Sequence, residues 1–204
     1  MEFLGFALTA IASYLLGSIP TGFLFAKAKG IDIRTVGSGN IGATNAFRVL
    51  GKSVGISVLL IDALKGFVAC RFVAFGPSAP SEVHQMIAGL FAILGHNYTC
   101  WLRFKGGKGI ATSAGVLLAL VPAGFAIALT TFLVVLAMSR YVSLSSICAA
   151  IVLPIGVWLA GGTTQMIALT TFLSLMAIYK HRANIGRLIA GTESRIGQKP
   201  KEAK

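Results

Sequence analysis

Long apolar runs separated by short polar segments dominate the sequence. A helix needs about 20 mostly apolar residues to cross a bilayer, and runs near or above that length cover 3–26, 54–75, 84–101, 109–139, 143–160 and 164–180. The run 109–139 is too long for one crossing, and Pro122 and Gly124 interrupt its middle. We therefore predict helices over 109–121, which is short for a span, and 122–139, giving seven membrane-spanning helices.

Basic residues alternate between the connections, which predicts the sidedness of the chain. Sixteen of the 18 Lys and Arg residues fall in 27–52, 102–108, the turn at Arg140 and the tail from Lys180, whereas 76–83, 121–123 and 161–163 carry none. Positively charged connections stay in the cytoplasm. Six spans would leave the basic tail outside. The predicted fold is an all-α integral membrane protein, a seven-transmembrane-helix bundle over 1–204 with its N-terminus outside and its C-terminus cytoplasmic.

Composition supports this prediction and narrows the class of protein. The chain has 204 residues, of which 55% are apolar and 12% charged, with a formal net charge of +12. So many apolar residues exclude a disordered chain and argue against a soluble domain of this size. The three cysteines form no CxxC pair, so neither a disulfide framework nor a zinc site is indicated. The positive surplus predicts that one face of the membrane protein meets anions.

The longest cytoplasmic connection contains a glycine-rich motif, Val36-Gly-Ser-Gly-Asn-Ile-Gly-Ala-Thr-Asn45. Backbone N–H groups in such a segment bind phosphate oxygens, above all before a helix N-terminus. The spacing resembles GxGxxG, but no βαβ unit surrounds it, so a dinucleotide fold is excluded. The alternative interpretation is a flexible turn with a helix cap.

Two further cytoplasmic segments carry candidate chemistry. Gly95-His-Asn-Tyr98 precedes Arg103-Phe-Lys-Gly-Gly-Lys-Gly-Ile-Ala-Thr112, which combines ammonium groups, glycines and a helix start. In the tail, a helical spacing would bring His181, Asn184 and Arg187 near one face. The alternatives are a positive membrane-edge anchor for the first segment and a positive cytoplasmic flank for the second.

The inventory of acidic residues and histidines limits the chemistry. Acidic residues never cluster, so no metal cage is indicated, and the sequence has no His-x4-Asp motif. Asp62 and Lys65 lie within the span 54–75, where charges are expensive unless they are paired and face the bundle. A structural ion pair and a catalytic role both stay open for them.

Taken together, GSGNIGATN, GHNY with RFKGGKGIAT, and HRANIGRLIAGTE resemble the three signature segments of the bacterial acyl-phosphate:glycerol-3-phosphate acyltransferases, the PlsY family. The resemblance covers essentially the whole chain. It implies an inner-membrane enzyme, with its active site at the cytoplasmic face, that transfers a fatty acyl group from acyl phosphate to the 1-hydroxyl of glycerol 3-phosphate. The products are lysophosphatidic acid and phosphate, and neither a cofactor, a metal nor a nucleic acid is implied.

The resemblance also implies the site residues. The implied catalytic residues are Ser38, Lys108, His181 and Asn184. The implied substrate-binding residues are Gly37, Gly39, Asn40, Gly42, Thr44, Asn45, Arg48, His96, Lys105, Gly106, Gly107, Thr112 and Ser143. The first loop would hold the phosphoryl group of the acyl phosphate, and Lys108 would stabilise the departing phosphate. The general base stays open between His181 and a substrate phosphate oxygen.

Two other functions remain as alternatives. A transporter or flippase for an organic phosphate also uses glycine-rich anion sites, but it predicts them near the midplane of the membrane. A binder of anionic lipid needs the positive charges but not the glycines.

Overall fold

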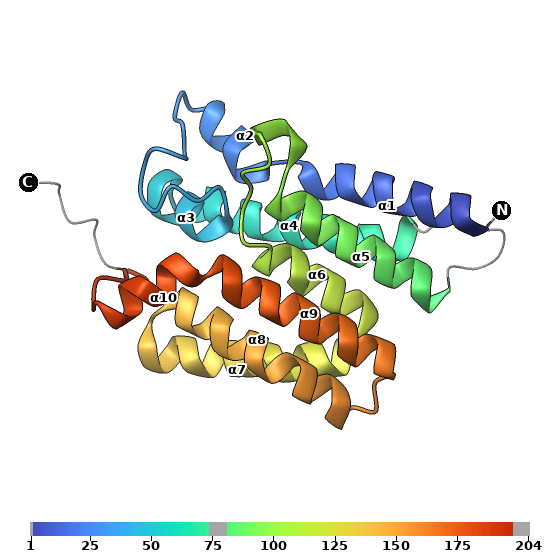
Figure 1. Ribbon diagram of the computed structural model, residues 1–204. Helices are drawn as coiled ribbons and strands as arrows, with labels where there is room; N and C mark the ends of the chain where they lie inside the picture. The colour runs from blue at the N-terminus through green and yellow to red at the C-terminus, as the bar shows by residue number, and fades with distance from the viewer. Residues whose placement is uncertain (1, 74–80, 198–204) are drawn as a thin grey trace, which may run out of the picture. The chain divides into compact units, whose positions relative to one another are not determined.

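The computed structural model describes residues 2–73 and 81–197, and every regular element in these two ranges is a helix (Figure 1). The helices are α1 (Glu2–Ser18), α2 (Thr21–Lys27), α3 (Ala43–Leu50), α4 (Lys52–Phe72), α5 (Glu82–Asn97), the 3-10 turn η1 (Cys100–Leu102), α6 (Ile110–Leu120), α7 (Pro122–Ser139), α8 (Val142–Leu159), α9 (Thr164–Lys180) and α10 (Arg182–Ile189). The all-α prediction is confirmed.

The chain divides into two compact units, Met1–Leu120 and Val121–Lys204. In the first unit α1 packs along α5, and α4 packs against α3, α5 and α6. In the second unit α8 packs between α7 and α9, and α10 contacts α8 and α9. The prediction of one domain over 1–204 stays a prediction.

Four segments are long and apolar enough to cross a membrane: Glu2–Lys27, Lys52–Phe72, Pro122–Ser139 and Val142–Leu159. Helices α5, α6 and α9 coincide with the other three predicted spans and are shorter than these segments. The number of seven spans and the sidedness of the termini therefore stay predictions. Part of the predicted outer connection 76–83 and the tail residues Lys199, Lys201 and Lys204 lie outside the described residues.

The first predicted span is not one continuous helix. Helix α1 ends at Ser18, and α2 begins at Thr21 after Pro20. Proline has no N–H to donate into the helical ladder and crowds the preceding turn, which explains the break. The predicted span 84–101 is also shorter than expected, because α5 ends at Asn97 and a separate 3-10 turn follows.

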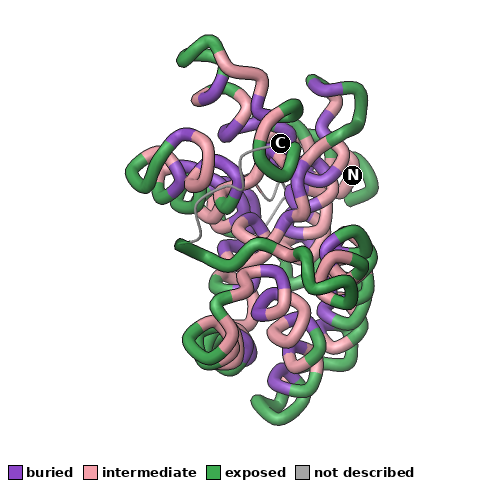
Figure 2. The backbone as a smooth tube through the Cα atoms, turned by 90° about the vertical axis from the view of Figure 1, so that its left-hand side faces the viewer, coloured by how far each residue is buried: buried purple, intermediate pink, exposed green. Residues whose placement is uncertain are grey.

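The helices pack through small residues and leave large apolar side chains outside, as a lipid environment favours. Helix α1 buries Thr9, Ser13 and Gly17, whereas Ile11 and Leu15 are exposed. A Cβ on Gly17 would overlap the backbone of Ala92 in α5, and a Cβ on Gly115 in α6 would overlap that of Ala63 in α4. Figure 2 shows the resulting alternation of buried and exposed positions along the helices.

Candidate active site

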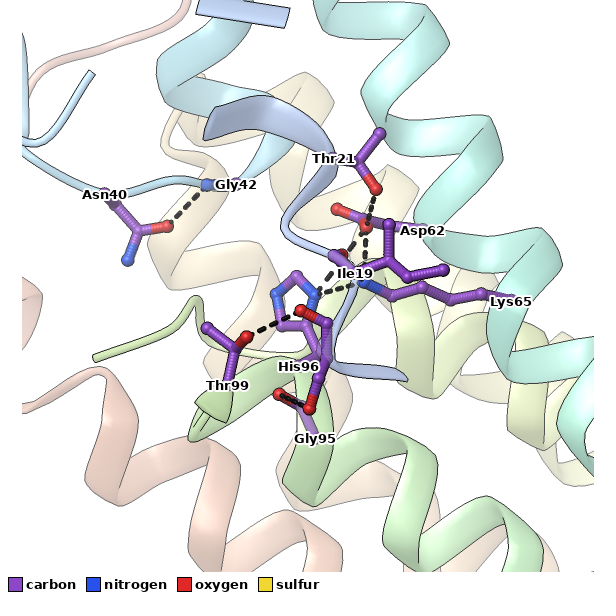
Figure 3. Close-up of polar contacts among 10 residues, drawn as sticks. Ile19, Thr21, Asn40, Gly42, Asp62, Lys65, Gly95, His96 and Thr99 are labelled. Carbon is purple, nitrogen blue, oxygen red and sulfur yellow. Dashed lines mark hydrogen bonds and ion pairs between the residues drawn. The ribbon is translucent and has the colours of Figure 1, made fainter. Parts of the chain in front are cut away.

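The first glycine-rich loop adopts a tight, defined conformation ahead of α3. Gly37 and Gly39 have φ angles of 61° and 70°, a left-handed conformation that suits glycine. The side-chain Oδ1 of Asn40 accepts a hydrogen bond from Gly42 N at 2.9 Å (Figure 3), and α3 begins at the next residue. The loop therefore leads directly into a helix N-terminus, where N–H groups and the helix dipole favour an anion.

Asn45 holds this loop together. Its Oδ1 accepts a hydrogen bond from Ser38 N at 2.8 Å, and its Nδ2 donates to the carbonyls of Val36 at 3.1 Å and Asn40 at 2.9 Å. A longer contact of 3.3 Å joins Nδ2 to Ile33 O. Asn45 is 1% exposed, and both the oxygen and the nitrogen of its amide bind the loop backbone. Asn45 therefore holds the backbone of the predicted phosphate loop in its conformation.

The polar side chains predicted to meet a ligand lie around this scaffold. Ser38 and Thr44 are exposed, and Arg48 is half-buried in the last turn of α3. Asp32, the one acidic residue in 27–52, is bound by Arg34 at 2.7 Å. The hydrogen bonds and charge of Arg34 lower the pKa of Asp32 to about 2, so this carboxylate stays ionised and paired.

The second predicted loop lies on the C-terminal turn of α5. Gly106 N donates to Asn97 O at 3.2 Å, and Gly107 N donates to His96 O at 3.0 Å. A Cβ on Gly106 would overlap His96 O, and one on Gly107 would overlap His96 Nε2. These glycines therefore allow the loop backbone to approach the helix closely.

The charged and polar residues of this loop differ in exposure. Lys105 is exposed, and Lys108 is half-buried two residues before the start of α6 at Ile110. Thr112 is 0% exposed, and its hydroxyl has no hydrogen-bond partner in the described part of the chain. His96 is 5% exposed and contacts Lys65 Nζ through Nδ1 at 3.0 Å. Thr112 and His96 thus lie behind the loop, whereas the two lysines lie at its surface.

The second unit carries the remaining predicted residues, and three of its side chains meet on one carboxylate. Glu193 Oε1 accepts hydrogen bonds from Ser143 Oγ at 2.7 Å and Asn184 Nδ2 at 2.6 Å. Glu193 Oε2 accepts one from Arg187 Nε at 2.6 Å. The Glu193 side chain is 9% exposed. Asn184 and Arg187 of the predicted face thus meet on Glu193, together with Ser143 of α8, whereas His181 contacts Ala177 O.

Glu193, on which these three side chains converge, was not singled out by the sequence interpretation. The only signal for it is its place at the end of the third motif. Burial raises the pKa of Glu193, but the hydrogen bonds from Ser143, Asn184 and Arg187 and the charge of Arg187 outweigh burial, and the net direction is downward. The carboxylate is therefore ionised near neutral pH.

His181 occupies the joint between α9 and α10 and is 2% exposed. Its Nδ1 lies 2.8 Å from Ala177 O. A carbonyl can only accept, so Nδ1 carries the hydrogen of this contact. In the described residues no three His, Cys, Asp or Glu side chains gather as metal ligands.

Comparisons with known proteins decide the family. A model of the family described as glycerol-3-phosphate acyltransferase matches residues 7–191. The chain belongs to this glycerol-3-phosphate acyltransferase family. It is 49% identical over 184 residues to the glycerol-3-phosphate acyltransferase of Geotalea daltonii, covering 90% of this chain and 94% of the relative. It is 48% identical over 192 residues to that of Geobacter sulfurreducens, covering 93% of this chain and 96% of the relative.

The fold of this family member is also similar to that of a solved structure. The crystal structure of PlsY, an integral membrane glycerol 3-phosphate acyltransferase, in its glycerol 3-phosphate form matches with a TM-score of 0.87 and 41% identity, covering 94% of this chain and 96% of that chain. Its lysophosphatidic acid form matches with a TM-score of 0.84 and 40% identity, covering 94% and 95%. With the four apolar segments, this likeness identifies the chain as an integral membrane protein.

Proposed function

We propose that this protein transfers a fatty acyl group from acyl phosphate to the 1-hydroxyl of glycerol 3-phosphate, giving lysophosphatidic acid and phosphate in phospholipid biosynthesis. Family membership and the relatives' names support acylation of glycerol 3-phosphate. The reaction takes place at the cytoplasmic face of a bacterial inner membrane, where the basic connections of the predicted topology lie. The acyl chains of donor and product stay in the lipid.

The observation that carries the proposal is the first loop, which Asn45 holds in a conformation suited to a phosphoryl group. Gly37 and Gly39 bend the backbone ahead of the α3 N-terminus, and Asn45 fixes that bend from inside. Ser38, Asn40 and Thr44 surround the phosphoryl group of the acyl phosphate. Lys108 stabilises the charge that develops on the departing phosphate.

The cluster on Glu193 is suited to the hydroxyl groups of the acceptor. Ser143 and Asn184 each donate a hydrogen bond to the Glu193 carboxylate. The Ser143 oxygen keeps acceptor capacity, which matches a hydroxyl group better than a phosphate.

The reaction needs few steps because acyl phosphate is an activated mixed anhydride. The O1 oxygen of glycerol 3-phosphate attacks the acyl carbonyl carbon, and the bond from that carbon to the phosphate oxygen breaks. The hydroxyl proton passes to His181 Nε2 or to a substrate phosphate oxygen. Orientation and charge neutralisation supply the rate enhancement, without a metal and without an acyl-enzyme.

A donor comparison tests the proposal. Purified protein in lipid nanodiscs, with a metal chelator present, is given glycerol 3-phosphate and either acyl phosphate or acyl-CoA. We expect lysophosphatidic acid with acyl phosphate and none with acyl-CoA. Acylation by acyl-CoA alone would contradict the assignment of acyl phosphate as the donor. A requirement for metal would contradict the metal-free reaction. Inertness with both donors would favour a transporter or a lipid binder.

A further inference from the structure

A charged pair is buried inside the apolar helix α4 of the first unit. Asp62 is 1% exposed and Lys65 is 5% exposed, and Lys65 Nζ lies 2.8 Å from Asp62 Oδ1 (Figure 3). Helix α4 is one of the four segments apolar enough to span a membrane. Charges in such a helix are costly, and an apolar pair of similar volume is often as stable. Stability alone therefore does not explain these two residues.

The ammonium group of Lys65 has three acceptors at hydrogen-bond distance. They are Asp62 Oδ1, Ile19 O at 2.9 Å and His96 Nδ1 at 3.0 Å. Ile19 lies at the break between α1 and α2, so its carbonyl is available outside a continuous helical ladder. An ammonium group has three hydrogens and no lone pair, so all its donors are used.

This geometry fixes the protonation of the His96 ring. Because Lys65 can only donate, His96 Nδ1 must accept, and the ring proton of the neutral imidazole lies on Nε2. His96 Nδ1 is 3.7 Å from Asp62 Oδ1, an ion-pair distance for a charged ring but beyond hydrogen-bond range, so a proton on Nδ1 forms no hydrogen bond there. Thr21 Oγ1 donates to Asp62 Oδ1 at 2.9 Å and holds the carboxylate in place.

The other side of the His96 ring faces the lysine-bearing loop. A Cβ on Gly107 would overlap Nε2, so the ring lies directly against the loop backbone. Gly107 N also donates to His96 O at 3.0 Å. Lys108, the residue assigned to the departing phosphate, is the next residue along the chain. A shift of the ring therefore moves the backbone that carries Lys108.

We propose that Asp62 and Lys65 are positioning residues: they hold His96 with its proton on Nε2 and its ring against Gly107, and so fix the loop that carries Lys108. The pair acts through His96 and touches no substrate. The inference rests on the proposed function, since it assigns the pair to the acyl-transfer site.

The first test measures the tautomer and needs no activity. The whole protein, labelled with 15N-histidine and held in nanodiscs, is studied by NMR at neutral pH. The chain has three histidines, so His84→Gln and His181→Gln variants assign the His96 signals. We expect a neutral ring protonated at Nε2. A ring protonated at Nδ1, or at both nitrogens, would overturn the inference even if acyl transfer is active.

The second test separates positioning from stability. The double variant Asp62→Leu/Lys65→Met removes both charges together, so neither charge is left buried without its counterion. Arg71→Met is the matched control, because Arg71 is an exposed cation of the same helix. We expect the double variant to insert and to lose about 10- to 100-fold in kcat, with KM for glycerol 3-phosphate within about two-fold and the control near wild type.

The outcomes distinguish this inference from the proposed function. A double variant with wild-type kcat would overturn the positioning role. If that variant fails to insert, the tautomer of the unmodified chain decides the inference. If the wild-type protein does not use acyl phosphate, the proposed function fails, and the tautomer measurement still tests whether the His96 ring proton lies on Nε2.

Discussion

Ser143 and Glu193 are 50 residues apart in sequence, yet the Ser143 hydroxyl donates a 2.7 Å hydrogen bond to the Glu193 carboxylate. Asn184 and Arg187 bind the same carboxylate. Two residues assigned to the acceptor substrate therefore take their orientation from an acidic residue. A substitution of Glu193 should therefore change the orientation of both side chains.

Glu193→Gln should reduce acyl transfer by about ten-fold or more, because a neutral amide accepts weaker hydrogen bonds and Ser143 and Asn184 lose their fixed orientation. The effect should appear in kcat/KM for glycerol 3-phosphate, measured by product formation. Glu2→Gln, which removes the same charge from the start of α1, is the control. Equal kcat/KM in the two variants would contradict the role of Glu193.

The stability of the cluster should depend on pH in a defined direction. The pKa of Glu193 is lowered in the folded protein, because the hydrogen bonds outweigh burial. The pKa of Glu in an unfolded chain is about 4.3. At pH values above this pKa the ionised Glu193 stabilises the fold, and this stabilisation is lost as the pH falls through the lower pKa that Glu193 has in the folded protein. The thermal midpoint of wild type minus that of Glu193→Gln should be constant from pH 7 to about pH 5 and then shrink. A difference that persists unchanged to pH 3 would refute this direction.

Two glycines with similar backbone angles allow a matched test of the phosphate loop. Gly37 has a φ angle of 61° and Gly30 one of 72°, but only at Gly37 would a Cβ overlap Asn45 Oδ1. Gly30→Ala should cost only the left-handed strain, about 1 kcal/mol in free energy of unfolding, with normal kinetics. Gly37→Ala should displace Asn45 and lower kcat/KM for acyl phosphate by about ten-fold or more. The loop assignment is wrong if both variants turn over acyl phosphate normally.

His181→Ala should severely reduce acyl transfer while the protein remains membrane-inserted, because the buried ring is anchored at Ala177 O and presents Nε2. His84→Gln removes a buried histidine outside the proposed site and is the control. If His181→Ala raises the KM for glycerol 3-phosphate and leaves the pH profile unchanged, a substrate phosphate oxygen is the group that accepts the hydroxyl proton. A lower kcat with loss of the acidic limb assigns it to His181. Near-normal rates would remove His181 from the site.

The sequence predicted the helical positions well, because apolar runs of a given length leave the chain few alternatives in a membrane. The break at Pro20 was not expected, although proline itself is a visible signal. Residue identities alone did not reveal that Asn45 turns its amide inward to the loop backbone. That orientation depends on the backbone path of 33–40, which local composition does not determine.

The partners of the charged side chains were harder to predict. The spacing of Asp62 and Lys65 left an ion pair and a catalytic role open, and the structure shows that the two side chains form an ion pair. The contact from Lys65 to His96 spans 31 residues and requires the packing of α4 against α5. Glu193 likewise gains its role only from the fold of α8 and α10 around it. Contacts between distant segments carry no periodic signal in a single sequence.

The most direct test of the central claim follows the atoms of the acceptor. Glycerol 3-phosphate labelled with 18O in its 1-hydroxyl is incubated with acyl phosphate and the purified protein, and the products are analysed by mass spectrometry. Direct attack on the acyl carbon predicts lysophosphatidic acid that retains the label in its ester, with one unlabelled phosphate released per product. Failure to form lysophosphatidic acid, or formation of free fatty acid with a labelled glycerol bisphosphate, would contradict the account.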